Sequence, residues 1–445
     1  MSAKPDGLAL SPDELVEDGS TPARTGQTDT CYNHPAMPID IRPVPPEEMD
    51  LAHFVVSYSF SSDRSAEGRE RMRHLEEMSP PLIGLFEDGQ LIACLRVYDF
   101  LMSVNGAGVR MGGVSSVACL PEYRRKGHVG QLLRHALSQM RDEGVPLAAL
   151  YTPHPSLYRR YGWMTASSNL KYSWHPKRVA AYNPSLAAGR AQRLSEEEWP
   201  ALAVLYKRFA EGRTGYIDRD ERWWKECGFR FIYDSERKLN DAAIWVGPGG
   251  EPGGYMTYRT QRERRGSGHE VTTLTIREFI ALTGSAYVGL LNYVLTHDLV
   301  DEIGWYGPID DPLPLAVDDA QQVKREFVDA YMLRVVDLPR AIEARPPAAG
   351  APEGAFAVAI ADASAPWNQG TWRIECAGGR LSARKVAGPG DIATDAATFA
   401  ALYGGFLKPS EAARAGLADV SDRSAALLAD RILASDYPPF GSDLF

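Results

Sequence analysis

Residues Val114 to Gly144 read VSSVACLPEYRRKGHVGQLLRHALSQMRDEG. Residues 114–120 alternate as in a β-strand, and Pro121 ends that strand because proline has no N–H to donate to a ladder. Apolar side chains then recur at the spacing of one helical face: Leu132, Leu133, Ala136, Leu137 and Met140. Gly144 is a typical C-terminal stop. The stretch therefore predicts a strand, a basic turn and a helix.

The turn places cations and glycines at the start of the predicted helix: Arg124, Arg125, Lys126, Gly127 and Gly130. Helix N-termini carry unpaired N–H groups and a positive dipole, so they suit a phosphate or pyrophosphate. The alternative is a solvated basic turn before an ordinary helix. The turn lacks the glycines of a dinucleotide-binding or Walker loop. It therefore indicates a phosphate site of another kind.

Composition narrows the class of protein. A chain of 445 residues predicts two or three domains, and its net charge of -10 argues against a general nucleic-acid binder. The 5 cysteines are scattered without CxxC spacing, which favours a reduced, cytoplasmic setting over disulfides or zinc. No apolar run is long enough for a membrane span, and no spacing of His, Asp and Glu suggests a metal.

The predicted elements divide the chain into a tail and three units. Residues 1–37 are rich in Ser, Thr, Pro, Asp and Gly and predict a disordered tail. Residues 38–175 predict a strand, helices, three antiparallel strands, a helix, a strand and a short helix. Residues 176–324 repeat helix, strands and helix without the basic turn, so they indicate a degenerate duplicate. Residues 325–445 predict strands followed by helices.

The basic turn resembles the R-x-x-G-x-G/A pyrophosphate loop of GCN5-related N-acetyltransferases (GNATs), with Val129 where glycine or alanine is usual. The three-unit layout resembles the enhanced-intracellular-survival (Eis) family of these enzymes. Four features carry that resemblance: GVSSVACLPEYRRKG (113–127), LYRRYGW (157–163), REFIAL (277–282) with HDLV (297–300), and MLRVVD (332–337) with APWN (365–368) and a terminal Phe.

The resemblance implies an α+β fold. Two GNAT-type mixed-sheet domains, the second degenerate, would be followed by an α/β domain like sterol carrier protein. Their expected boundaries are 38–175, 176–324 and 325–445. A homohexamer is also implied.

The resemblance further implies acetyl-CoA as co-substrate and assigns residues to it by position. The backbone of Val117, Ala118 and Cys119 would hold the pantetheine arm. The pyrophosphate would be held by Arg125, Lys126, Gly127, His128, Val129 and Gly130. Pro153, which stands where the family has serine, and His154 would make further contacts.

Tyr158 falls on the family's general acid, and Phe445 supplies its general base through the terminal carboxylate. Taken alone, the aromatic run that contains Tyr158 is more often part of a core. The implied reaction is direct acetyl transfer to a primary amine: an aminoglycoside, a polyamine or a lysine side chain. Two alternatives remain open. One is an acyltransferase that tailors an amine in natural-product biosynthesis, and the other is a non-enzymatic lipid or ligand carrier.

Overall fold

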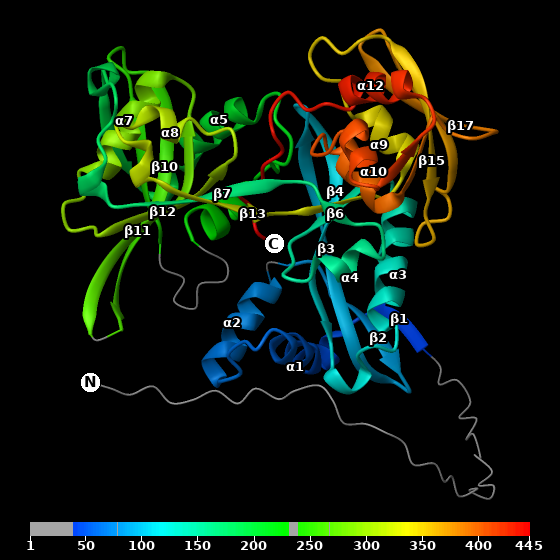
Figure 1. Cartoon of the computed structure of the whole chain (residues 1–445). Coiled ribbons are helices and arrows are strands. Elements are labelled where there is room, and N and C mark those ends of the chain that lie inside the picture. The colour runs from blue at the N-terminus through cyan, green and yellow to red at the C-terminus, as the bar shows by residue number, and fades with distance from the viewer. Residues whose placement is uncertain (1–38, 78, 231–238, 267) are drawn as a thin grey trace, which may run out of the picture. The chain divides into compact units, whose positions relative to one another are not determined.

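A computed structural model describes residues 39–445, apart from 78, 231–238 and 267 (Figure 1). The tail predicted over residues 1–37 lies outside the described residues. The three β-sheets of the described chain belong to one contact unit, Ile39–Phe445. Within the described ranges, no helix is both long and apolar enough to cross a bilayer.

The first sheet contains the strand, basic turn and helix predicted over residues 114–144. Its strand order is β1 (Ile39–Pro43), β2 (Ile83–Glu87), β3 (Gln90–Val104), β4 (Ala107–Cys119), β5 (Leu147–Leu150), β14 (Met332–Val335) and β6 (Met164–Thr165). Its helices are α1 (Met49–Ser59), α2 (Ala66–Glu77), α3 (His128–Asp142) and α4 (Pro155–Arg159). The predicted apolar face of α3 is buried against the sheet, and β5 is a buried strand parallel to β4. Both predictions are confirmed.

The second sheet has the order β13 (Lys324–Asp329), β7 (Ser168–Trp174), β12 (Glu302–Pro308), β11 (His269–Ala281), β10 (Pro252–Arg265), β9 (Asp241–Val246) and β8 (Arg190–Leu194). Its helices are α5 (Trp199–Ala210), α6 (Glu221–Trp223), α7 (Gly284–Leu295) and α8 (Leu313–Ala316). Helix, strands and helix recur in the order expected for a duplicate of the first unit.

The third sheet has the order β17 (Arg380–Val386), β16 (Gly370–Ala377), β15 (Gly354–Ala361), β18 (Ile392–Asp395) and β19 (Ala418–Val420). Four helices accompany it: α9 (Leu338–Ala344), α10 (Ala396–Tyr403), α11 (Pro409–Arg414) and α12 (Arg423–Ile432). All residues of α10 are buried, because this small, apolar helix fills the space between the third sheet and β14.

The sheets divide the chain differently from the expected boundaries at 175 and 325. β7 belongs to the second sheet, whereas β14 inserts between β5 and β6 of the first sheet. β6 pairs with β14 and β7 pairs with β13, so a two-stranded ribbon continues from one sheet to the other. Pairing between strands far apart in the sequence leaves no local signal. The order of predicted elements along the chain therefore could not show that β7 and β14 lie on the other side of the expected boundaries.

A second connection joins the first two sheets and matters for the site. Ile217 bridges to Met102 near the end of β3. On either side, the Ser103 N–H donates to the Tyr216 carbonyl at 2.7 Å and the Asp218 N–H donates to the Leu101 carbonyl at 2.7 Å. The segment that follows α5 therefore lies along β3 as a short extra strand.

Candidate active site

The candidate site is built around a fork between β4 and β5. The two strands pair only from Met111↔Leu147 to Gly113↔Ala149, although β4 continues to Cys119. Ser116 has φ 52°, and the register of β4 against β3 shifts beside it. A bulge of this kind bends and twists a strand, so it turns the second half of β4 away from β5. Among the described strands, β4 beyond Gly113 has a partner only on its β3 side.

Val117, Ala118 and Cys119 occupy this second half of β4. Ala118 and Cys119 pair with β3, which leaves their strand edge toward β5 at the fork. The Cys119 carbonyl accepts from Ser59 Oγ at 3.3 Å and from Arg124 Nε at 3.0 Å. Burial raises the pKa of the Cys119 thiol, so it stays protonated as a packed core group. Because the Cys119 carbonyl is already hydrogen-bonded and its thiol is packed in the core, only the backbone N–H of Cys119 is left for a role at the fork.

The basic turn leads directly into the first turn of α3. Gly127 is the N-cap residue with φ 89°, a left-handed conformation that favours glycine, and its Cβ position faces open space. Arg125 and Lys126 are exposed, and Lys126 Nζ lies 4.9 Å from the centre of the Tyr123 ring. At Gly130 a Cβ would collide with the Tyr161 hydroxyl, so glycine is required for α4 and its following turn to pack on α3.

His128 opens α3 with an unsatisfied side chain. It is 5% exposed, and neither Nδ1 nor Nε2 has a hydrogen-bond partner among the described residues. A buried polar group without a partner costs free energy, so a ligand atom or a water is expected there. Its place in the first turn of the helix makes an anionic oxygen a fitting partner. Val129, the next residue, packs against the core of the first sheet.

Tyr158 lies on α4, 8% exposed, in the same apolar cluster as Cys119. Its ring meets Trp163 edge to face at 6.4 Å. Burial raises the pKa of Tyr158 to about 12, so the phenol keeps its proton at neutral pH. Its hydroxyl has no hydrogen-bond partner among the described residues. The side chain is thus both a core residue and an available proton donor.

Pro153 and His154 follow β5 on the exposed loop that leads into α4. The His154 N–H donates to Thr152 Oγ1 at 2.9 Å, and His154 occupies the N-cap position of α4 without a capping hydrogen bond from its side chain. Both residues therefore lie between the end of β5 and Tyr158. Among the described residues, no hydrogen bond, ion pair or ring contact joins either of them to the basic turn.

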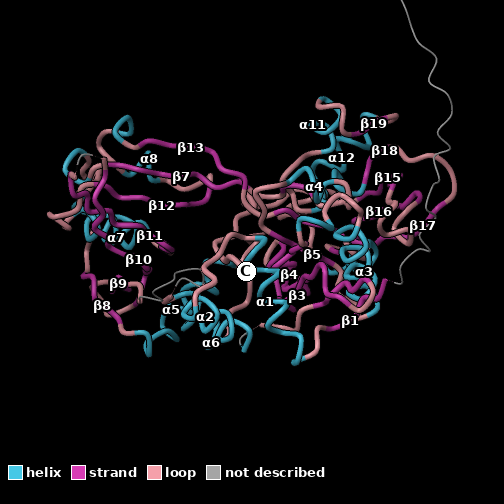
Figure 2. Tube along the Cα trace, turned by 90° about the horizontal axis from the view of Figure 1, so that it is seen from below, coloured by secondary structure: helices cyan, strands magenta, loops and turns pink. Residues whose placement is uncertain are grey.

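The C-terminus returns to the fork. The Phe445 ring is 8% exposed and lies 5.0 Å from Phe100 and 5.5 Å from Tyr151, centre to centre. A Cβ at Gly113 would be 2.9 Å from Phe445 Cε2. Gly113 ends the β4–β5 pairing, so the last residue of the chain covers the point where the strands part. Figures 1 and 2 both show the C-terminus beside β3 and β4.

The sequence of the chain matches three family models along its length. Acetyltransferase (GNAT) domain models match residues 40–166 and 215–335, and a sterol carrier protein domain model matches residues 338–442. N-acetyltransferase Eis of Mycobacterium tuberculosis is 24% identical over 342 residues, which is 73% of this chain and 78% of that protein. The crystal structure of Eis1 from Mycobacterium abscessus superposes with a TM-score of 0.74 at 25% identity, covering 92% of this chain and 100% of that one. This chain belongs to the Eis-like GNAT family.

One further relative and one further solved structure are similar to this Eis-like protein. An uncharacterised N-acetyltransferase of Streptomyces coelicolor is 27% identical over 391 residues, covering 85% of this chain and 91% of that protein. A GCN5-related N-acetyltransferase from Anabaena variabilis shares the fold, with a TM-score of 0.80, 22% identity and coverage of 92% and 100%. The predicted family, the α+β fold class with two GNAT domains and a sterol-carrier-like domain, and the N-acetyltransferase activity are confirmed.

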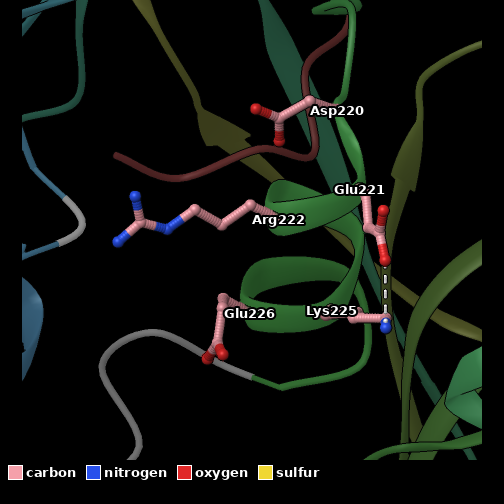
Figure 3. Close-up of a pocket in the computed structure, with 5 residues that line it drawn as sticks. All are labelled: Asp220, Glu221, Arg222, Lys225 and Glu226. Atoms are coloured by element: carbon pink, nitrogen blue, oxygen red, sulfur yellow. Dashed lines mark ion pairs between the residues drawn. The ribbon is translucent and has the colours of Figure 1, made fainter.

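An acidic hollow of about 440 Å³ lies on the second domain of this Eis-like protein, lined by Asp220, Glu221, Arg222, Lys225 and Glu226 (Figure 3). Lys225 pairs with Glu221 at 3.1 Å. None of the residues predicted from the sequence lines it. The fork is the better candidate for the reacting centre because Phe445 packs at Gly113, where β4 and β5 part, and Tyr158 shares an apolar cluster with Cys119 of β4. The hollow, by contrast, is an open surface of charged side chains.

Sequence reasoning missed the aromatic side chains that hold Phe445. Tyr98 and Phe100 stack at 5.4 Å on one face of β3, and Trp223 meets Phe100 edge to face at 5.2 Å. The i, i+2 spacing of Tyr98 and Phe100 on a predicted strand could have shown that both rings lie on the same face of that strand. Nothing local to Trp223 or Tyr151 indicated that they would join it.

Proposed function

We propose that this Eis-like N-acetyltransferase transfers the acetyl group of acetyl-CoA directly to a primary amine, with Tyr158 as general acid and the Phe445 carboxylate as general base. The observation that carries the proposal is the position of Phe445 over Gly113, at the fork. The packing of the Phe445 ring at Gly113 supports a terminal carboxylate near the strand edge that begins beside it.

The fork and the turn fit the parts of acetyl-CoA. The amide groups of a pantetheine arm can add to the free edge of β4 at Val117 and Ala118 as an extra strand would. The first turn of α3, with Arg125 and Lys126 beside it, suits the pyrophosphate. The unpartnered nitrogens of His128 suit a phosphate oxygen. Pro153 has no hydroxyl to offer, so only its backbone and His154 remain for that part of the cofactor.

The proposed reaction needs no covalent enzyme intermediate. The amine nitrogen attacks the thioester carbonyl carbon, and β4 N–H groups stabilise the developing oxyanion. The Phe445 carboxylate takes a proton from the nitrogen. The C–S bond breaks, and the Tyr158 hydroxyl gives its proton to the departing sulfur. Because burial raises the pKa of Tyr158, the phenol still carries that proton at neutral pH.

The acceptor class follows from charge. A net charge of -10 and a terminal carboxylate at the site favour a cationic amine. The hollow is lined by three carboxylates: Asp220, Glu221 and Glu226. The same segment carries Trp223, whose ring meets Phe100, one of the aromatic side chains around Phe445. An aminoglycoside, a polyamine or a lysine side chain fits these features.

The test is thiol release from acetyl-CoA with kanamycin, spermidine and Nα-blocked lysine as acceptors. We expect turnover with at least one, and a large loss of kcat in Tyr158→Phe with unchanged acetyl-CoA affinity. Tyr172→Phe is the matched control, because Tyr172 is another buried tyrosine whose hydroxyl lacks a partner in the described chain, but it lies in the second sheet. Bound acetyl-CoA without turnover across this panel and a broader set of amines would refute the proposal.

We also propose, on the family resemblance, that the protein is a homohexamer in the cytoplasm. Sedimentation velocity of the full chain tests the assembly, and cell fractionation tests the location. A monodisperse monomer at micromolar concentration would refute the hexamer.

A further inference from the structure

We infer that Arg219 and Asp443 are positioning residues that hold the terminal carboxylate of Phe445 at the fork. In this view the second GNAT domain is the anchor for the catalytic end of the chain. The inference rests on the proposed role of Phe445 as general base and adds to it the residues through which that base is placed.

Arg219 belongs to the second domain and is fixed there. Its side chain is 4% exposed and forms a two-pronged contact with Glu278 of β11, at 2.7 and 3.0 Å. The Tyr255 hydroxyl donates to the same carboxylate. The Arg219 guanidinium also lies 3.9 Å from the centre of the Tyr206 ring. Contacts on two sides leave this guanidinium little freedom to move.

Asp443 ties the chain end to that guanidinium. Its carboxylate lies 2.9 Å from Arg219 Nε and accepts from Arg219 Nη2 at 3.0 Å. The Trp223 indole N–H donates to Asp443 Oδ1 at 2.8 Å. Ser442 Oγ accepts from Arg219 Nη2 at 3.2 Å. Two consecutive tail residues are therefore held by one fixed cation.

The anchor is rigid relative to the fork. Arg219 directly follows the segment whose Ile217 bridges to Met102 of β3. The Phe440 N–H donates to the Thr214 carbonyl of the same segment at 3.0 Å. From Asp443 the chain can reach only about 7 Å to Phe445, at roughly 3.5 Å per residue. The tail is thus fastened on both sides of Gly441, and the remaining span delivers Phe445 to Gly113.

The charges favour a positioning role over a purely structural one. Glu278 alone neutralises Arg219, and Asp443 adds a second buried carboxylate, 8% exposed. Burial alone would raise the pKa of Glu278, yet Arg219 brings that pKa below its usual value. Burial raises the pKa of Asp443. A second buried carboxylate, which is not needed to neutralise Arg219, costs folding stability. The presence of Asp443 therefore indicates a functional role rather than a stabilising one.

The experiment combines Asp443→Ala with a chain extended by Gly-Ser after Phe445, which displaces the terminal carboxylate. Asp443→Ala leaves the Arg219–Glu278 pair complete, so the second domain keeps its fold. In the native chain we expect Asp443→Ala to lower kcat by about 10-fold or more, the effect of a misplaced catalytic group. In the extended chain the same substitution should change kcat by less than about 2-fold, because the two changes act on one group. Asp443→Asn, which keeps an acceptor for Trp223, should restore part of the rate.

Two further readouts separate positioning from general damage. Acetyl-CoA affinity should stay the same in Asp443→Ala. Carboxypeptidase A should release Phe445 faster from Asp443→Ala than from the native chain, as followed by mass spectrometry. Asp436→Ala is the matched control: this exposed tail aspartate accepts from the Ala349 N–H at 2.8 Å and should alter neither kcat nor release.

The outcomes distinguish the two proposals. An extended chain as active as the native one overturns the role of Phe445 and, with it, this inference. A large loss on extension together with an unchanged kcat in Asp443→Ala overturns the positioning role alone. An equal loss from Asp443→Ala in both chains also overturns it, because the residue would then act independently of the carboxylate.

Discussion

Gly113→Ala tests whether the placement of Phe445 controls the reaction. The added Cβ would lie 2.9 Å from Phe445 Cε2 and 2.6 Å from Phe100 Cε2. Carbon atoms pack at about 3.5–4.0 Å, so one or both rings must retreat by roughly 1 Å. Phe100 is stacked on Tyr98 and therefore resists, which leaves the chain end to move. A misplacement of about 1 Å at a reacting group can cost about 100-fold in rate.

We therefore expect kcat to fall by about 10- to 100-fold, measured as thiol release at saturating amine, with the fold retained by circular dichroism. In Phe445→Ala, which keeps the carboxylate and lacks the ring, Gly113→Ala should cost less than about 2-fold more. Gly304→Ala is the matched control, because a Cβ on this strand glycine meets open space. Native turnover in Gly113→Ala would refute the reasoning that the ring contact positions the base.

Three other predictions concern single side chains. Tyr158→Phe should lower kcat by about 100-fold or more. Because burial raises the pKa of Tyr158 to about 12, loss of its proton should not lower the native rate below about pH 10. A fall in rate at lower pH that Tyr158→Phe abolishes would contradict this. His128→Ala should raise the Kd of both acetyl-CoA and free coenzyme A by about 10-fold in calorimetry, whereas a change for acetyl-CoA alone would argue against a phosphate contact. Asp311, between β12 and α8, accepts from the Tyr287 hydroxyl at 2.6 Å and from the Leu313 N–H at 2.8 Å. Burial raises the pKa of Asp311 from 3.8 to about 7, so the stability that its proton contributes is present below pH 3.8 and lost as pH rises through 7. Asp311→Asn should accordingly raise Tm at pH 8 more than at pH 5, and an equal shift at both values would be inconsistent with the titration.

The local parts of the site could be predicted because local rules produce them. Apolar residues at helical spacing placed α3, and the basic turn marked its start; the structure makes Gly127 the N-cap residue. Tyr158 could be named only through the resemblance, since one aromatic run looks like any other buried segment. The bulge at Ser116, which opens the fork, could not be predicted from the sequence. The positive φ of this serine is set by the pairing of β4 with its neighbouring strand, and not by the local sequence.

Local sequence patterns predicted the type and order of the elements, and the family resemblance predicted the family, whereas the role of the chain end stays a proposal. Tertiary packing set which strands share a sheet, as with β14 inside the first sheet. It also decided that Arg219, Glu278 and Asp443 meet in one buried group, although they come from three distant segments. Propensity and periodicity act over a few residues, whereas such contacts form only when the sheets have packed and water is excluded.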